Sequence, residues 1–579
     1  MQKINNMTFK ILRRTLHKFF HSINRRFRKP HLIVFILITA ITFSTRADAQ
    51  FRGGGYSPWE ECTFRCCFAI GYPFAIILEA LLPPPKPYSS ILIVDTKTET
   101  VTEKGKSSMA EWSRYSTAIA GNKIVMGVRG SHRGGNSILI IDAKKEKVTG
   151  KRGLSEAKWG RYSTAVVGNK VVMGPGDTDK NSILIVNTKK GTVSEKGRLS
   201  KNRWGYNSTT VAGNKVVMGP GNNHYAILII DAKKETVTLK GGLSKAEWGR
   251  HSTAVVGNKV VMGRGFEDNG NSILIIDTEK GTVIEKGGLS KANWGFNSTI
   301  IANNKVVMGR GDSKGASILI IDATQETVTE IGGLSKTYWG YNSTAVAGNK
   351  VVMGPGSRNT SILIVDTEKG IITEIGRLPN TNWGYESTAV AGNKVVMGPG
   401  RFMGDGRSDN ASILIVDTEK GIITEKGKLP NAKWGYKSTA VVGNKVIMGP
   451  GSSDTSILII DTEKGIITEK GKLPNANWGY ESTAVADNKV IMGPGSRNTS
   501  ILIIDTATGT VTEKGGFSKT HWGYTSTAVV GNKVVMGGET SILIIDTTKE
   551  IVTEKGGLSK AYWGQSCTVV FGDKVIMGR

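Results

Sequence analysis

The chain has 579 residues, of which 39% are hydrophobic, 7% are aromatic and 73 are glycine, and its formal net charge is +28. This composition favours a turn-rich β protein and argues against a predominantly helical one. A basic surface favours anionic partners. However, lysines such as Lys286, Lys291 and Lys305 recur at set places, which is more typical of solvated sheet edges that are protected from pairing.

Residues 1–49 are predicted to be a signal peptide. A long basic stretch that ends at Lys29 precedes an apolar run over 32–43, and Ala-Asp-Ala at 47–49 provides a small-x-small cleavage site. The apolar run is too short to cross a bilayer as a helix, which needs about 20 residues. An uncleaved membrane anchor is the alternative. The protein is therefore expected to be secreted, periplasmic or attached to the cell surface.

Residues 50–89 form a separate N-terminal segment that contains cysteines, an apolar stretch and a proline-rich end. The apolar stretch 68–82 contains a proline and a glutamate, so we expect a short buried or interfacial helix. Membrane or cell-surface association is expected to involve 32–43 or 68–82, if it occurs.

The chain has four cysteines, three of them in this N-terminal segment: Cys62, Cys66, Cys67 and Cys567. In an exported protein four cysteines suggest disulfides, and we predict that Cys567 pairs with one of the other three. Zinc binding is a weaker alternative because Cys-x3-Cys-Cys lacks a matching second pair.

Residues 90–579 consist of eleven repeats, and each repeat has one tryptophan at the same place. The tryptophans are separated by 41 to 51 residues and are Trp112, Trp159, Trp204, Trp248, Trp294, Trp339, Trp383, Trp434, Trp478, Trp522 and Trp563. A period near 45 residues indicates a repeat architecture. Each tryptophan is predicted to be a wedge between neighbouring repeats.

The unit 456–495 shows the pattern of one repeat. Asp461 is placed to bond the backbone of a turn that ends at Gly465, and a two-residue hairpin connects two later runs. The four β-rich runs cover 456–461, 466–469, 482–486 and 489–492. Four short strands in about 45 residues are typical of a β-propeller blade. A right-handed β-helix is the competitor, but its coils are usually shorter and lack paired hairpin turns.

The order of the runs predicts how the ring closes. With the Ser-Thr-Ala-Val strand innermost and the Thr-Val-Thr-Glu strand outermost, the chain begins and ends within a blade. The two C-terminal strands would then pair with the two N-terminal strands. We therefore predict an all-β propeller of eleven four-stranded blades in one large ring. Because propellers usually have four to eight blades, two smaller rings that divide near 401–411 remain the alternative.

The run Thr-Ala-Val-x-Gly-Asn-Lys-Val-Val-Met-Gly, followed by Ser-Ile-Leu-Ile-Ile-Asp-Thr, resembles kelch and YVTN-type β-propeller repeats over 90–579. Most units have Gly-x-Gly in place of the kelch double glycine, and the tryptophan precedes the inner strand, so YVTN-type blades are more similar. The resemblance implies binding or scaffolding roles, with some enzymes, and a fold alone does not decide among them.

The sequence predicts no catalytic residue, metal site or cofactor. The four histidines beyond the leader occupy different places in their repeats, and no catalytic triad or phosphate loop stands out. The recurring aspartates are expected to cap turns. No sequence-specific binding of nucleic acid is expected.

Variable positions cluster on one predicted rim. The connections 129–136, 177–181, 222–225, 266–271 and 401–411 differ in length and sequence. The residues two and three after each tryptophan also vary and should surround the mouth of the channel, where aromatic and arginine side chains suit glycans or peptides. The candidate binding residues are Arg114, Arg161, Tyr206, Arg250, Phe296, Tyr341, Tyr385, Tyr436, Tyr480 and Tyr524.

These observations predict an exported, non-enzymatic binding or scaffold protein. It is expected to be a monomer that recognises a glycan, peptide or protein partner through the variable rim, with a protein or an acidic glycan as the expected partner. The alternative is a propeller enzyme, such as a lyase or a glycan-active protein, with its site at the channel mouth.

Overall fold

The computed structural model describes residues 90–104, 112–128, 137–155, 158–265, 270–311, 316–400, 412–430, 433–452, 454–559, 562–565 and 567–578. The chain divides into two units, Met1–Pro85 and Lys86–Arg579, and every described residue belongs to the second. The predicted signal peptide, the N-terminal segment 50–89 and the apolar runs at 32–43 and 68–82 lie outside the described residues. Among the described residues, no helix is long and apolar enough to cross a membrane.

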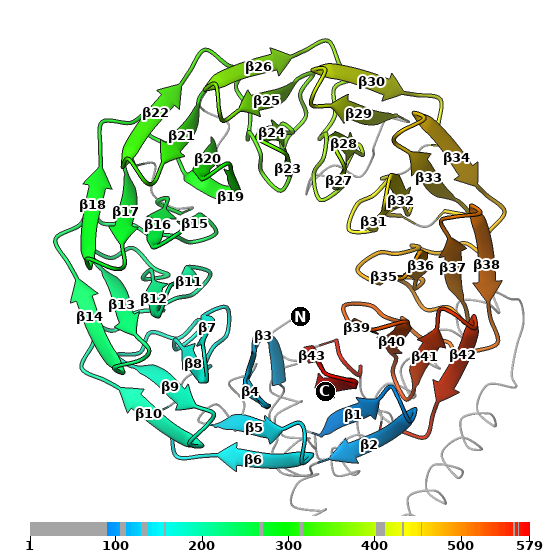
Figure 1. The fold of residues 1–579 in the computed structure, drawn as a ribbon, viewed down its shortest axis with the longest axis horizontal. Helices are drawn as coiled ribbons and strands as arrows, with labels where there is room; N and C mark the ends of the chain where they lie inside the picture. Colours follow the sequence, from blue (N-terminus) through cyan, green and yellow to red (C-terminus); the bar gives the residue numbers. More distant parts are fainter. Residues whose placement is uncertain are drawn as a thin grey trace, which may run out of the picture. The chain divides into compact units, whose positions relative to one another are not determined.

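The second unit is a ring of eleven four-stranded antiparallel sheets (Figure 1). We number these blades in chain order, so that blade 1 contains β3–β6, blade 2 contains β7–β10, and so on to blade 10, which contains β39–β42. Blade 11 contains β43, β44, β1 and β2. The predicted all-β propeller with eleven blades in a single ring is confirmed, and neither two smaller rings nor a β-helix is formed.

In blades 1 to 10 the four strands run from the channel outward in chain order, and in blade 11 the order is β43, β44, β1 and β2. The innermost strands are β3 (Trp112–Ala120), β7 (Thr164–Val167), β11 (Thr209–Ala212), β15 (Thr253–Val256), β19 (Trp294–Ala302), β23 (Thr344–Ala347), β27 (Thr388–Ala391), β31 (Thr439–Val442), β35 (Thr483–Ala486), β39 (Thr527–Val530) and β43 (Cys567–Phe571). The second strands are β4 (Lys123–Val128), β8 (Lys170–Met173), β12 (Lys215–Met218), β16 (Lys259–Met262), β20 (Lys305–Arg310), β24 (Lys350–Met353), β28 (Lys394–Met397), β32 (Lys445–Met448), β36 (Lys489–Met492), β40 (Lys533–Gly537) and β44 (Lys574–Gly578).

The third strands are β5 (Ile138–Asp142), β9 (Ile183–Asn187), β13 (Ile227–Asp231), β17 (Ile273–Asp277), β21 (Ile318–Asp322), β25 (Ile362–Asp366), β29 (Ile413–Asp417), β33 (Ile457–Asp461), β37 (Ile501–Asp505), β41 (Ile542–Asp546) and β1 (Ile91–Asp95). The outermost strands are β6 (Lys147–Lys151), β10 (Thr192–Lys196), β14 (Thr236–Lys240), β18 (Thr282–Lys286), β22 (Thr327–Ile331), β26 (Ile371–Ile375), β30 (Ile422–Lys426), β34 (Ile466–Lys470), β38 (Thr510–Lys514), β42 (Ile551–Lys555) and β2 (Thr100–Lys104).

The two ends of the repeat region close the ring within blade 11. Strand β1 pairs antiparallel with β44, and Leu92 lies opposite Met577 in this register. At the end of the same ladder, both the backbone N–H and the hydroxyl of Thr96 donate to the carbonyl oxygen of Asp573, at 2.8 Å in each case. The predicted closure is confirmed, and it leaves neither of these strands with an open edge.

The strand sequences follow from the depth of each strand in the ring. The four apolar residues of each third strand, Ile-Leu-Ile-Ile in most blades, are buried on both faces because neighbouring blades cover both sides of the sheet. The outermost strands instead alternate exposed and partly buried residues, as β34 does. Each sheet is therefore continuously apolar in its third strand and half-solvated in its outermost strand.

The hydrophobic core lies between the blades, and a buried tryptophan lies at every interface except that between blades 11 and 1, where the side chain of Trp112 lies outside the described residues. Trp204 of blade 3 packs with Ile183 and Ile185 of blade 2 and with Val216 and Met218 of its own blade. Its side chain is completely buried, and its indole N–H donates to the carbonyl oxygen of Ser200 at 2.9 Å. The predicted wedge is therefore confirmed, with its one polar atom satisfied.

The glycine that follows the methionine of the second strand is required by this packing. At Gly219, a Cβ atom would overlap the backbone carbonyl oxygen of Trp248 in the next blade. Because backbone rather than a flexible side chain occupies this space, any side chain would force the blades apart. The invariance of this glycine from repeat to repeat thus reflects the distance between blades.

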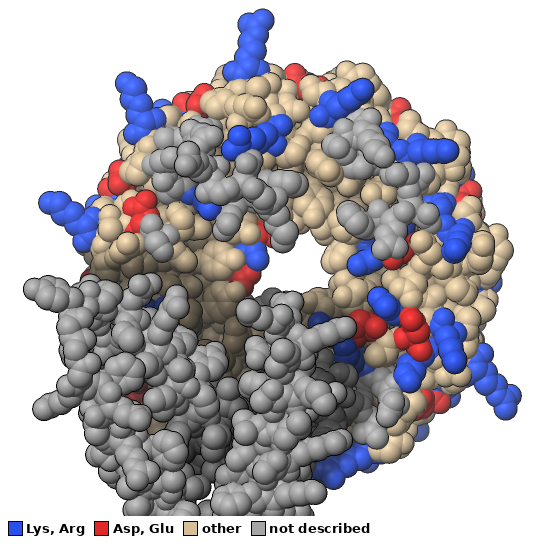
Figure 2. All heavy atoms as spheres, turned by 180° about the vertical axis from the view of Figure 1, so that it is seen from behind, with Lys and Arg blue, Asp and Glu red and all other residues tan. Residues whose placement is uncertain are grey.

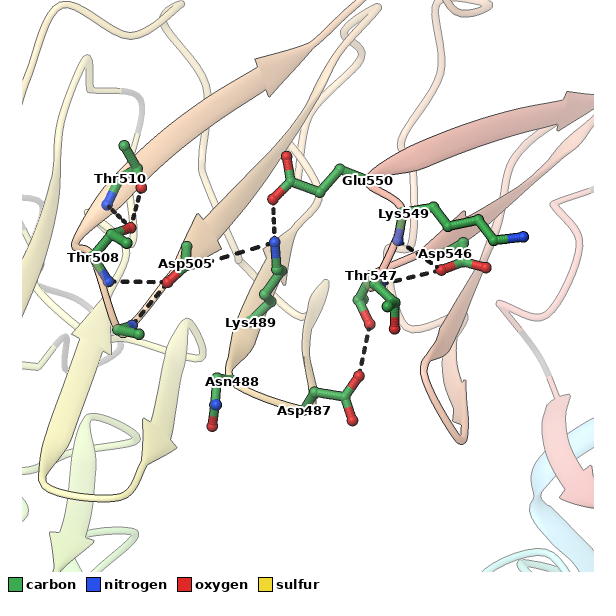
Figure 3. Close-up of polar contacts among 12 residues, drawn as sticks. Asp487, Asn488, Lys489, Asp505, Thr508, Thr510, Asp546, Thr547, Lys549 and Glu550 are labelled. Carbon is green, nitrogen blue, oxygen red and sulfur yellow. Dashed lines mark hydrogen bonds and ion pairs between the residues drawn. The ribbon is translucent and has the colours of Figure 1, made fainter.

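In nine blades the lysine that opens the second strand contacts the next blade. Lys489 of blade 9 lies between Asp505 of its own blade, at 3.7 Å, and Glu550 of blade 10 (Figure 3). Nearby, the hydroxyl of Thr547 in blade 10 donates to Asp487 of blade 9 at 3.2 Å. Of the lysines expected to be solvated edge residues, Lys305 occupies this position at the start of a second strand, whereas Lys286 ends an outermost strand and Lys291 is exposed in a loop.

The partner of each such lysine depends on the residue at one position of positive φ in the next blade's turn. Where this residue is glutamate, its carboxylate pairs with the lysine; the pairs are Lys574–Glu146, Lys170–Glu235, Lys259–Glu326, Lys489–Glu550 and Lys533–Glu99. Where it is glycine, as at Gly421, the lysine bonds a turn carbonyl: Lys350 donates to Thr418 O at 2.6 Å. The left-handed glutamates thus gain an ion pair that offsets some backbone strain.

Candidate functional site

Two positions between Trp-Gly and the innermost strand form the candidate site. We call the residue two after the tryptophan the first mouth position and the next residue the second mouth position. In blade 3 these are Tyr206 and Asn207, and the N–H of Ser208 closes the turn by donating to Gly205 O at 3.0 Å. Gly205 has a φ of 80°, which favours glycine at this tight bend.

A belt of backbone hydrogen bonds joins the second mouth positions around the channel. In each bond the N–H of one blade donates to the carbonyl oxygen of the preceding blade over 2.7–2.9 Å. The donors are Tyr162, Asn207, His251, Asn297, Asn342, Glu386, Lys437, Glu481 and Thr525, and their φ values lie between 48° and 54°. This mouth belt fixes the positions of the side chains beside it, because each residue is held from both sides.

Aromatic rings at the first mouth position contact one another in series from blade 5 to blade 10. Successive ring centroids lie 5.8–6.3 Å apart, within the range of favourable aromatic pairs. The members of this aromatic series are Phe296, Tyr341, Tyr385, Tyr436, Tyr480 and Tyr524. Tyr385 is only 5% exposed, and burial raises the pKa of Tyr385, Tyr436 and Tyr524. Much of the series therefore packs between blades and builds the wall of the mouth.

The arginines at the first mouth position are paired with carboxylates. Arg161 Nη1 lies 2.7 Å from Asp177, which belongs to the variable connection 177–181, and Arg250 Nη1 lies 2.8 Å from Glu247. Arg250 also lies over the ring of Tyr206, 5.9 Å from its centroid. The structure therefore places the variable connection and the mouth on the same rim, as predicted. It also neutralises much of the arginine charge there. The side chain of Arg114 lies outside the described residues.

Three charged residues occupy the second mouth position of blades 7, 8 and 9. Lys437 Nζ lies 2.6 Å from Glu481 and 3.8 Å from Glu386. Burial lowers the pKa of Lys437, but the hydrogen bond and charge of Glu481 and the charge of Glu386 outweigh it, so the net shift is upward. Burial is also the main reason that the pKa of Glu386 is raised. This triad gives one arc of the mouth a fixed charge pattern.

The aromatic series ends at blade 11, where Gln565 occupies the first mouth position. A pocket of about 350 Å³ opens there, and its walls include Tyr480, His521, Tyr524, Tyr562 and Gln565. The connection after β40 is short: the N–H of Gly538 donates to the carbonyl oxygen of Ser541 at 3.0 Å. The missing ring and the short connection together leave this space, which we call the mouth pocket.

Arg497 contacts Tyr562, one of the residues that line the mouth pocket. Arg497 of blade 9 donates to the hydroxyl of Tyr562 at 3.2 Å and lies 3.3 Å from Glu539 of blade 10. Tyr562 is 46% exposed, so its ring is accessible to a ligand. Sequence reasoning selected Tyr480 and Tyr524 but missed His521, Tyr562 and Gln565. The 41-residue step between the last two tryptophans and the Gly537-Gly538 pair were the available signals.

Cys567 is the one cysteine of the predicted disulfide that lies among the described residues. Cys567 is a free thiol with no exposed surface, and its sulfur lies 3.0 Å from the hydroxyl oxygen of Thr117 in blade 1. Burial raises the pKa of this thiol to about 11. The three candidate partners, Cys62, Cys66 and Cys67, lie outside the described residues, so the pairing stays a prediction.

Metal ligands do not cluster in the part of the chain that the structure describes, where no three His, Cys, Asp or Glu residues are placed to hold an ion. The recurring aspartates instead cap turns, as predicted. For example, Asp461 Oδ1 accepts the backbone N–H of Lys464 at 3.0 Å, and Gly465 has a φ of 65°. What the mouth offers is aromatic surface, tyrosine hydroxyls and amide groups, which suit non-covalent binding.

No protein-family model matches the sequence, and no curated protein sequence matches it. Among solved structures, the dihydro-heme d1 dehydrogenase NirN in complex with DHE is 11% identical, with a TM-score of 0.34, over 69% of this chain and 77% of that chain. Apo AztD from Citrobacter koseri is 13% identical, with a TM-score of 0.31, over 62% and 96%. A chain of the Mitotic Checkpoint Complex is 12% identical, with a TM-score of 0.30, over 52% and 84%. These likenesses concern the fold alone.

Proposed function

We propose that this protein is an exported, non-enzymatic binding protein that holds a sugar unit of a glycan in the mouth pocket. The observation that carries the proposal is the interruption of the aromatic series at Gln565, which leaves a space of about 350 Å³ beside the rings of Tyr480, Tyr524 and Tyr562. Sugar rings stack on aromatic faces, and their hydroxyls bond amide and hydroxyl groups, which Gln565 and the tyrosines provide.

The rigid backbone of the mouth favours a preformed binding site, in preference to a site that changes shape when a ligand binds. The mouth belt holds Thr525 through a 2.8 Å bond from its N–H to Glu481 O, and the hydroxyl of Thr525 donates to Gln565 O at 3.1 Å. A site built on such fixed elements loses little entropy when a ligand binds. Export, which residues 1–49 indicate, would bring the pocket into contact with extracellular or periplasmic glycans.

The test is glycan-array binding of the purified full-length protein, followed by calorimetry with the glycans that bind. Gln565→Tyr restores the residue that most blades carry and fills the pocket, so it should weaken binding by at least tenfold. Tyr562→Ala removes one aromatic wall and should weaken binding similarly. Tyr225→Ala removes an exposed tyrosine of blade 3, which does not line the pocket, and serves as the matched control.

Two outcomes would overturn the proposal. One is a protein that binds no glycan on the array. The other is a Gln565→Tyr variant that keeps the affinity of the unmodified protein. The bound glycan is also incubated with the protein and analysed for cleavage, because turnover that Gln565→Tyr abolishes would support the alternative of a glycan-active enzyme at the same mouth.

A further inference from the structure

A second pocket lies beside the turns that connect third to outermost strands, between blades 2 and 3. Its volume is about 300 Å³, and its polar lining includes Lys170, Asn187, Lys189 and Lys190 of blade 2 and Asn214 and Lys233 of blade 3. We call it the lysine pocket. Lysine and arginine side chains also lie elsewhere around the ring (Figure 2). The lysine pocket differs from those places in the carboxylates that it lacks.

Blade 2 lacks a carboxylate that the other blades have. The third strand ends in aspartate in ten blades, at Asp95, Asp142, Asp231, Asp277, Asp322, Asp366, Asp417, Asp461, Asp505 and Asp546, and in Asn187 in blade 2. Asn187 preserves the turn, because its Oδ1 still accepts the N–H of Lys190 at 3.0 Å. The substitution therefore removes a negative charge and keeps the local structure.

The missing aspartate changes the surroundings of Lys170, the lysine that opens the second strand of blade 2. In blade 4, Lys259 lies 3.3 Å from Asp277 of its own blade and also pairs with Glu326 of the next blade. The Lys489 link of blade 9 has the same two acidic partners (Figure 3). Lys170 has one such partner, Glu235 at 2.7 Å, and a neutral amide in the place of the aspartate.

A second carboxylate is replaced in the turn itself. In blade 8 the side-chain amide of Asn444 donates to the turn residue Glu463 at 2.6 Å, and in blade 6 Asn349 donates to Glu368 at 2.9 Å. The corresponding turn residue in blade 2 is Lys189, opposite Asn169. Blade 2 thus has a positive charge where these blades have an acceptor.

The neighbouring turns strengthen the positive field. Blades 1, 2 and 3 each carry two consecutive exposed lysines in this turn, namely Lys144 with Lys145, Lys189 with Lys190, and Lys233 with Lys234. Blades 4, 6, 7 and 8 carry Glu-Lys there instead. Four lysines line the pocket, and Glu235 is the carboxylate paired with one of them. Like charges this close favour a bound anion.

We propose that the lysine pocket binds an oxyanion group, a sulfate or a phosphate, which takes the place of the two carboxylates that blade 2 lacks. Lysine ammonium groups and asparagine amides are donors, so the lining can bond several oxygens of one such group. The proposal is independent of the mouth pocket, because its lining residues are different and lie on the turns of blades 2 and 3.

The test measures binding of inorganic sulfate, inorganic phosphate and sulfated or phosphorylated monosaccharides to the full-length protein at low ionic strength by calorimetry. Asn187→Asp and Lys189→Glu each restore the residue found in other blades, so both variants should fold. Each should weaken anion binding by roughly tenfold or more, because a carboxylate within the pocket repels the anion. Comparing the affinities for sulfate and for phosphate shows which oxyanion is preferred.

The matched control is Lys234→Glu, which makes the same charge change on the same turn rim but does not line the pocket. It should change the affinity by less than about threefold, since exposed charges outside a site are strongly screened. The proposal is overturned if no oxyanion binds, if Asn187→Asp retains full affinity, or if Lys234→Glu weakens binding as much as Lys189→Glu.

Discussion

The backbone N–H of Asn297 donates to the carbonyl oxygen of His251 at 2.9 Å, which joins blade 5 to blade 4 at the channel mouth. Asn297 has a φ of 50°, a conformation that asparagine and glycine tolerate and β-branched residues disfavour. The mouth belt thus depends on a strained backbone conformation that recurs from blade to blade.

Asn297→Val should therefore lower the free energy of unfolding by about 1–3 kcal/mol, because valine resists the left-handed region. Asn297→Gly is the control and should leave stability nearly unchanged, since glycine adopts this conformation freely. Urea unfolding measures both variants. A valine variant as stable as the glycine variant would contradict the role given to the belt.

Gly219→Ala should destabilise the protein by about 1–3 kcal/mol or more, because the new Cβ would overlap Trp248 O in the next blade. Gly241→Ala, in the outer part of the same blade, is the matched control. No atom of the structure lies within 4 Å of a Cβ built at Gly241, so its stability should change little. Thermal unfolding of the two variants compares them directly, and equal losses would refute the packing argument.

The Lys489–Glu550 pair should contribute a modest coupling energy between blades 9 and 10. The two side chains are 16% and 37% exposed, so a double-mutant cycle with Lys489→Ala and Glu550→Gly should give about 0.2–1 kcal/mol. Glu550→Gly alone should cost little, because glycine relieves the positive φ of 53° at this position. A coupling energy indistinguishable from zero would show that the turn geometry holds the blades without the ion pair.

Acid should weaken the hydrogen bonds that Glu554 of blade 10 accepts from Ser518 and Ser541. Burial raises the pKa of Glu554, but hydrogen bonds from Ser518 and Ser541 outweigh it, and the pKa falls below its ordinary value of 4.5. A lowered folded-state pKa gives stability that is present above the ordinary value and is lost as pH falls through the folded-state value. Glu554→Gln should therefore cost about 1 kcal/mol at pH 7.

The pH dependence provides the check on Glu554. The difference in unfolding free energy between the unmodified protein and Glu554→Gln should shrink as the pH falls below 4.5. Denaturant titrations at several pH values between neutrality and acid measure this difference. A difference that stays constant over the series would mean that the charge of Glu554 is not what stabilises the link to Ser518 in the loop that leads into its blade.

Cys567 should be unreactive in the folded protein. Its thiol is completely buried, and its pKa is raised to about 11, so little thiolate is available at pH 8. Iodoacetamide followed by peptide mapping should find Cys567 unlabelled before unfolding and labelled after unfolding without reductant. Failure to label the unfolded chain until reductant is added would instead support the predicted disulfide.

The sequence predicts the ring well because the same residue pattern recurs in each blade. Trp204, Gly219 and their equivalents appear at fixed spacing, and the half-blades at the two ends of the repeat region predict the β1–β44 pairing. Tryptophan burial and turn capping by Asp461 follow from residue chemistry alone. Eleven blades could be counted directly because the repeats differ so little.

The candidate site was harder to predict because it arises from what individual blades lack. Gln565 is visible as an exception to the tyrosines, but the pocket beside it also requires the short connection at Gly538 and the ring of Tyr562 in three dimensions. Likewise, the sequence does not show that Arg161 is paired with Asp177, which lies 2.7 Å away in the structure. Such pairings depend on three-dimensional distances, both between adjacent blades and between loops. The spacing of residues along one repeat does not give these distances.

Blade 11 is built from both ends of the repeat region, and this has a consequence for synthesis. Among the described strands, the outer half of blade 11, β1 and β2, emerges from the ribosome first, while β43 and β44 emerge last. Until β44 is made, β1 is paired only with β2 and its other edge is open. Blade 11 is then incomplete, so it cannot fill the space between blades 10 and 1. Translation must therefore reach the last repeat before the circle exists. A chain stopped short of Lys574 would carry an exposed strand edge that quality-control proteases and chaperones can recognise.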